Sequence, residues 1–159
     1  MTTPGRVLAM AMALLCSGGV LLRAQSSDRF DALIGLARVK RDAGDPAGAR
    51  RYFEQAREVR RFGPAEQTEY FWTLTSTDTV AAVRAGIDVL DRSPGDDTVR
   101  ERSIMLAIAT GNEPAVQMLA GAGTKREPGR SLWHRRLAES LARLGRHRES
   151  ARAYAAAVR

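Results

Sequence analysis

The chain has little of several residue types that define common protein classes. Its 159 residues include one cysteine, Cys16, and two lysines, Lys40 and Lys125, and aromatic residues make up only 6% of the sequence. A single cysteine excludes a framework of intramolecular disulfides. Few aromatic residues and plentiful alanine suit helices packed through small side chains better than a β-sheet. We therefore expect an all-helical chain, and its length suits one domain.

Residues that could support catalysis or bind a metal are also scarce. His134 and His147 fall on different predicted helices, with no cysteine or carboxylate at ligand spacing. Neighbouring carboxylates such as Asp96 and Asp97 lack the apolar enclosure that would raise a pKa. The sequence predicts a protein that is not an enzyme and has neither a cofactor nor a metal site.

The net charge is positive, and arginine carries almost all of it. The formal charge is +7, from 25 Lys and Arg residues against 18 Asp and Glu residues. The arginines alternate with acidic residues, as they do on solvated helical surfaces, and no aromatic residues stand among them to stack on bases. We expect no nucleic-acid binding, and an acidic protein is the partner that this charge favours.

The first 24 residues have the parts of a secretory signal peptide. Residues 1–6 are short and positive, residues 7–22 are largely apolar, and Ala24 precedes Gln25. We expect cleavage after Ala24 and export to the periplasm. An uncleaved membrane anchor is the alternative, although the apolar stretch is shorter than the roughly 20 residues that span a bilayer. Leu15, before Cys16, departs from the small residue that a bacterial lipobox requires.

A pattern of small, aromatic and small residues recurs after residue 25. The two clearest copies are Gly44, Asp45, Ala49, Phe53, Ala56 and Gly145, Arg146, Ser150, Tyr154, Ala157. Steps of 33 residues from Ala49 reach Ala82 and Ala115, which is the period of a helix-turn-helix repeat. Stacked repeats bury their cores against each other and offer a groove, which favours binding over catalysis.

Turn residues divide this region into four predicted helix pairs. We expect the pairs at residues 29–63, 64–96, 97–130 and 131–159. In the third pair, the second helix is predicted to be short, at residues 115–122, and to be followed by a flexible link at residues 123–129. Asp45 and Ser131 are predicted N-caps. The packing side of the first helix is predicted to be Leu33, Leu36, Ala37 and Lys40.

The first helix pair resembles the tetratricopeptide repeat family. The resemblance rests on Leu36, Ala37, Gly44, Asp45, Ala49, Phe53 and Ala56. It implies an all-α fold, a right-handed α-solenoid of about four such pairs, in which the first helix of each pair lines a concave surface. Leu33 stands where the family usually has a tryptophan, and Lys40 where an aromatic residue is common.

The resemblance also implies where a partner would bind, on the outward side of each first helix. The predicted partner-binding residues are Arg38, Arg41, Gln67, Phe71, Arg100, Arg135, Glu139 and Arg143, and Ile34 is predicted on the same side. Arginine dominates this set, and guanidinium groups bind carboxylates through paired hydrogen bonds. The lysine and asparagine of chaperone-binding members are absent, so that specific function is not implied.

These observations predict a protein-binding scaffold of the bacterial cell envelope that holds a peptide or protein partner in an arginine-lined groove. The alternative is a membrane-anchored assembly factor of an envelope or secretion complex, held by an uncleaved N-terminal helix. The oligomeric state is not defined by the sequence. The last predicted helix is expected to carry an apolar surface that docks on a partner or on a second copy, formed by Ala153, Tyr154, Ala157 and Val158.

Overall fold

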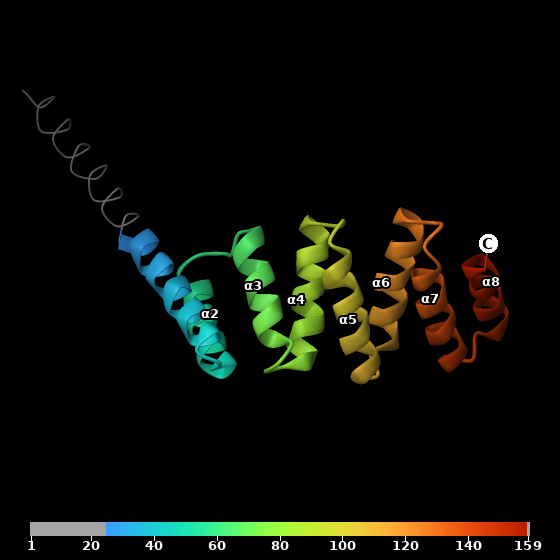
Figure 1. Ribbon diagram of the computed structural model, residues 1–159, viewed down its shortest axis with the longest axis horizontal. Coiled ribbons are helices and arrows are strands. Elements are labelled where there is room, and N and C mark those ends of the chain that lie inside the picture. The colour runs from blue at the N-terminus through green and yellow to red at the C-terminus, as the bar shows by residue number, and fades with distance from the viewer. Residues whose placement is uncertain (1–24, 159) are drawn as a thin grey trace, which may run out of the picture. The chain divides into compact units, whose positions relative to one another are not determined.

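The computed structural model describes residues 25–158, and this range is helical apart from short connections (Figure 1). Residues 25–42 are helical. Seven helices follow: α2 (Pro46–Val59), α3 (Pro64–Leu74), α4 (Thr79–Arg92), α5 (Asp97–Ala109), α6 (Glu113–Arg126), α7 (Ser131–Arg143) and α8 (His147–Ala157). The described range contains no strand, which confirms the all-α prediction. The predicted signal segment, residues 1–24, lies outside the described residues.

The chain divides between Phe62 and Gly63 into two compact units, where its length suggested one domain. In the first unit, the helix of residues 25–42 and α2 share a core. Phe62 packs edge-on against Phe30 and Phe53, with ring centroids 6.2 and 5.9 Å apart. The guanidinium of Arg60 covers the Phe30 ring at 3.9 Å. These contacts close the pair around three buried phenylalanine rings.

The packing side of the first helix differs from the prediction. Phe30, Ile34 and Ala37 are buried, whereas Leu36 is half exposed. The buried residues follow a spacing of four and three, so they share one helical face, on which the Phe30 ring contacts Phe62. The prediction was right for Ala37 and wrong for Leu36, because it centred the face on Leu33 and Leu36 and did not weigh the larger apolar area of Phe30.

In the second unit, each helix from α3 to α8 packs against the next one along the chain (Figure 1). Close approach depends on small residues. A Cβ added at Gly86 of α4 would lie 2.0 Å from Ser103 Oγ and 2.9 Å from the Phe71 ring. A Cβ at Gly123 of α6 would lie 2.7 Å from the buried ring of Trp133 in α7. Glycine at these two positions lets α4 and α6 approach their neighbours.

The turns within three helix pairs share one design. Gly44, Gly111 and Gly145 have φ values of 74°, 66° and 73° and end the first helix of each pair. The amide after each glycine donates to the carbonyl five residues back, as from Asp45 to Lys40, which is a Schellman motif. Asp45 then accepts from the Gly48 amide as the predicted N-cap of α2. Asp78 and Asn112 cap α4 and α6 in the same way.

Two predictions about the second unit were wrong. The residue at the N-cap of α7 is Arg130, and Ser131 is the first helical residue. Helix α6 continues to Arg126 instead of ending near residue 122. It continues because Gly123 is buried under Trp133 and because the Thr124 hydroxyl donates to the Gly121 carbonyl. Packing on α7 thus overrides the low helix propensity of the two glycines.

No helix within residues 25–158 is long and apolar enough to cross a membrane.

Candidate functional site

A pocket of about 310 Å³ opens on one face of the second unit, which we call the odd-helix face because it is formed by α3, α5 and α7. The residues that line it are Trp72, Asp97, Thr98, Glu101, Arg102, Met105 and Arg130. Most come from α5, one comes from α3 and one directly precedes α7. A pocket of this size lies at the lower limit for small-molecule sites and suits a single amino-acid side chain.

Two apolar side chains are held at this pocket with much of their surface exposed. Trp72 is 38% exposed and Met105 is 44% exposed. The Trp72 ring packs edge-on against the fully buried Phe71, with centroids 4.9 Å apart and an interplanar angle of 68°. Met105 is contacted by Arg136 of α7, whose Nη2 lies 3.5 Å from Sδ. An exposed tryptophan that is held in place by a buried ring is typical of the residues that contribute most of the binding free energy at protein interfaces.

The side of the pocket next to α7 is a network of charges. Arg130 donates to Asp97 at 2.6 Å and to Glu127 at 3.2 Å, and its guanidinium lies over the Trp133 ring at 4.6 Å. The hydrogen bond from Arg130 is the main cause that lowers the pKa of Glu127 below its ordinary value. The same hydrogen bond, with the nearby charges of Asp97, Glu127 and Glu101, raises the pKa of Arg130. On this side of the pocket the guanidinium of Arg130 is therefore paired with two carboxylates.

Arg100 was predicted on the outward side of α5, and that placement is wrong. Its side chain is 2% exposed and donates to the carbonyls of Leu119 at 3.3 Å and Pro94 at 2.5 Å. Its Nε lies 3.7 Å from Asp97 Oδ1. Arg100 shares its helical face with Ser103 and the core of α5, so it ties α5 to α6 and does not reach the pocket surface on the odd-helix face.

Three other predicted outward residues are also in the core. Gln67 and Phe71 lie on the buried side of α3, and Ile34 lies in the core of the first unit. Tyr70, Phe71 and Trp72 are consecutive, and a helix cannot bury three consecutive side chains on one face. The structure buries the first two and exposes Trp72. That geometric limit was the available signal, and the sequence analysis missed it.

The remaining predicted residues are accessible, but most have partners. On α7, Glu139 accepts from Arg136 at 3.2 Å, and Arg143 donates to Glu113 of α6 at 2.6 Å. Arg135 is exposed on the same helix. Arg38 and Arg41 are exposed in the first unit, where Arg41 donates to Asp42. Partner binding by these five residues stays a prediction, and Arg102, Trp72 and Met105 join them as candidates.

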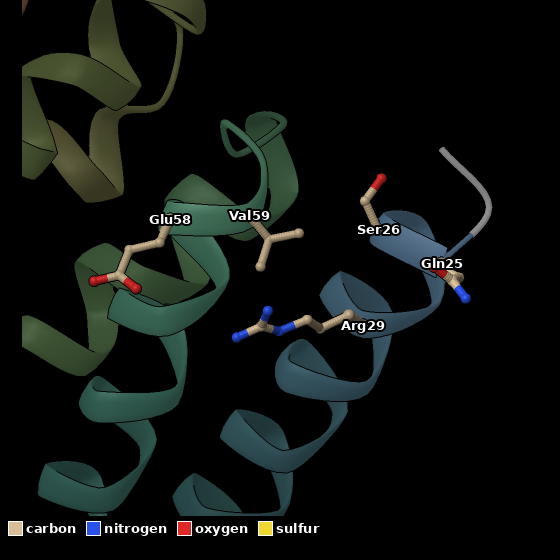
Figure 2. Close-up of a pocket in the computed structure, with 5 residues that line it drawn as sticks. All are labelled: Gln25, Ser26, Arg29, Glu58 and Val59. Carbon is tan, nitrogen blue, oxygen red and sulfur yellow. The ribbon is translucent and has the colours of Figure 1, made fainter. Parts of the chain in front are cut away.

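Two further pockets carry fewer converging polar groups. One, of about 540 Å³, lies in the first unit between the helix of residues 25–42 and α2, where Arg29 and Val59 reach toward each other (Figure 2). Its other lining residues are Gln25, Ser26 and Glu58. The second, of about 320 Å³, lies between α4 and α6 and includes Arg100, and apolar residues form most of its lining. Within residues 25–158 no group of histidine, cysteine and acidic side chains could hold a metal ion.

Tandem helix pairs, three of them joined by glycine turns and three with an Asp or Asn cap on the second helix, define a helical-repeat protein. Comparison with solved structures confirms a fold of the tetratricopeptide type at the level of structure. MamA from AMB-1 matches with a TM-score of 0.66 at 19% identity, over 80% of this chain and 70% of that chain. MamA from MSR-1 matches with a TM-score of 0.61 at 17% identity, over 80% and 74%.

MamA from Desulfovibrio magneticus RS-1 matches with a TM-score of 0.58 at 16% identity, over 82% of this chain and 75% of that chain. No family model matches the sequence, and no curated protein does. The similarity therefore concerns the fold.

Proposed function

We propose that this chain is a non-enzymatic scaffold that binds a protein or peptide partner on the odd-helix face of its second unit. The observation that carries the proposal is the pair of half-exposed apolar side chains, Trp72 and Met105, at an open pocket edged by charged residues. An apolar anchor ringed by polar groups is the usual arrangement of a protein-binding hot spot. The similarity in fold to MamA, a repeat protein, supports a scaffold that binds other proteins.

The test is capture of partners by crosslinking in envelope extract, with wild type beside Trp72→Ala and Met105→Ala. Val80→Ala is the matched control because Val80 is also an exposed apolar residue but lies on α4. We expect the two pocket variants to lose a partner that wild type and the control retain. Equal capture by all four chains, with equal helix content by circular dichroism, would contradict binding at this pocket.

We further propose that the protein acts in the bacterial cell envelope after export. The proposal is supported by the basic start, the apolar stretch and Ala24 in the first 24 residues. Intact-mass analysis of the protein from cells tests it. A chain beginning at Gln25 would support cleavage and a periplasmic scaffold. A chain retaining the first 24 residues in the membrane fraction would instead favour the membrane-anchored assembly factor.

A further inference from the structure

Arg102 differs from the other charged residues at the pocket. Asp97 is bonded to Arg130, and Arg130 also lies close enough to Glu101 for that charge to raise its pKa. In the part of the chain that the structure describes, no hydrogen bond or ion pair engages the guanidinium of Arg102. The pocket thus has one cation whose hydrogen-bonding capacity is unused.

The position of Arg102 sets where a ligand carboxylate would lie. Asp97 marks the α7 side of helix α5, because it pairs with Arg130 next to that helix. Five residues further on, Arg102 projects roughly 140° around the helix from Asp97, toward the α3 side of the pocket. Met105 lies between these two directions, and Trp72 lines the pocket from α3. An apolar side chain between Trp72 and Met105 would therefore have Arg102 beside it.

We infer that the partner presents an internal segment in which an apolar residue, such as Leu or Met, stands next to Asp or Glu. The apolar side chain contacts Trp72 and Met105, and the neighbouring carboxylate accepts two hydrogen bonds from Arg102. This inference rests on the proposed function and adds the chemistry of the partner. A basic neighbour is disfavoured because it would face Arg102, while the carboxylates of the pocket already have Arg130 close to them.

Binding of defined peptides to the full chain tests this inference, with the indole N–H signals of ¹⁵N-labelled protein as the readout. The chain has two tryptophans. Trp72 is half exposed at the pocket and Trp133 is fully buried, so the two signals report on the site and on the core separately. Trp72→Phe assigns the signals. The probe is a blocked hexapeptide, Gly-Ser-Leu-Glu-Ser-Gly, compared with versions that carry Gln or Lys in place of Glu, or Gly in place of Leu.

We expect the Leu-Glu probe to shift the Trp72 signal and to bind about tenfold more tightly than the Gln probe, since one charge-assisted contact is gained. The preference should decline as salt is added, because the contact is exposed. Arg102→Gln should bind both probes with equal affinity. Arg84→Gln is the matched control, an exposed arginine on α4 that should keep the tenfold preference.

Three results would overturn the inference: equal affinity for the Glu and Gln probes, tighter binding of the Lys probe, or a preference that survives Arg102→Gln. A further probe ends at Leu with a free carboxylate. If it binds more tightly than the hexapeptide, the partner presents its C-terminus to the pocket, and the inference of an internal segment is wrong. If no probe shifts Trp72 while a partner is still captured through Trp72 and Met105, the partner chemistry is wrong and the scaffold function stands. If no probe shifts the Trp72 signal and no partner is captured through Trp72 and Met105, the function is rejected as well.

Discussion

At the scale of single residues, the contact of Gly123 with Trp133 decides how α6 meets α7. Trp133 is fully buried, and its ring occupies the space where a side chain at Gly123 would begin. Gly121, two residues earlier on α6, has nothing within 4 Å of an added Cβ. The two glycines therefore belong to the same helix but differ in what surrounds them.

We predict opposite effects of alanine at these two positions. Gly123→Ala should lower the free energy of unfolding by about 1–3 kcal/mol, because overpacking against Trp133 exceeds the gain in helix propensity. Gly121→Ala should raise it by about 0.5–1 kcal/mol, since only the propensity changes. Urea unfolding followed by circular dichroism measures both. Equal stabilisation of both variants would contradict the close packing of Gly123 against Trp133.

Glu113 makes stability depend on pH. Burial acts to raise the pKa of Glu113, but hydrogen bonds donated by Arg143 and Ser140 outweigh it, and the pKa lies below its ordinary value. The pKa of Glu113 is lower in the folded state, so its ionised form stabilises the fold. This contribution to the free energy of unfolding is complete above the unfolded-state pKa of about 4.3 and is lost as pH falls through the folded-state pKa. Glu113→Gln should therefore unfold at lower urea than wild type at about pH 7.

The difference in urea midpoint between the two chains should shrink as the pH falls through the folded-state pKa of Glu113, because the wild type then loses the charge that the hydrogen bonds from Arg143 and Ser140 stabilise. Asp88→Asn is a suitable control, since Asp88 is an exposed carboxyl of α4. A difference between Glu113→Gln and wild type that stayed constant with pH would mean that the ion pair with Arg143 does not form.

Which residues face outward was only partly predictable from the sequence. Arg135, Glu139 and Arg143 are accessible as predicted, but Phe71 and Arg100 are buried. Charge suggested that Arg100 faces solvent, whereas its two terminal nitrogens donate to two backbone carbonyls that come together only in the fold. Such acceptors lie 6 and 19 residues away, so no local pattern could identify them.

At the scale of helices, the two arginines of α5 show how two faces of one helix differ in role. Arg100 joins α5 to the Pro94 and Leu119 carbonyls, while Arg102 faces the pocket. The helices themselves were predictable, because glycine and proline mark their ends and apolar periodicity marks their interiors. Which face of each helix is buried was harder to predict. The buried side of α5 mixes apolar and polar residues, so the apolar periodicity of its sequence is weak; they include Val99, Arg100, Ser103 and Ile104.

We predict that Arg100→Ala and Arg102→Ala have very different effects on stability. Arg100→Ala should cost about 3 kcal/mol or more, because it removes buried packing and leaves two carbonyls without their donor. Arg102→Ala should change the free energy of unfolding by less than about 0.5 kcal/mol, as exposed substitutions usually do. Thermal unfolding of both variants checks this. Comparable losses would place Arg102 in the core and remove it from the pocket.

At the scale of the molecule, the second unit is a series of helices in which the principal contacts join neighbours in sequence. Stability in such arrays is approximately a sum of helix-pair terms and interface terms. Weakening one interface should therefore lower the local stability of the helices beside it more than that of helices further away. The three comparisons with MamA, each below 20% identity, show that this arrangement tolerates extensive change in sequence.

We predict that Gly123→Ala increases amide hydrogen exchange mainly in α6, α7 and α8. Exchange in α3 and α4 should rise less, because the disturbed interface between α6 and α7 is separated from them by α5. Hydrogen–deuterium exchange with mass spectrometry resolves the helices. A uniform increase from α3 to α8 would mean that the unit unfolds only as a whole.

Packing of each helix on its predecessor also has a consequence for the rate at which the second unit folds. Contacts between consecutive helices span short stretches of chain, so the loop-closure entropy that opposes them is small. Proteins with such low contact order fold in microseconds to milliseconds. As the chain leaves the ribosome, α4 can pack on α3 before α5 has emerged, and no apolar helix face has to stay exposed until a distant segment arrives.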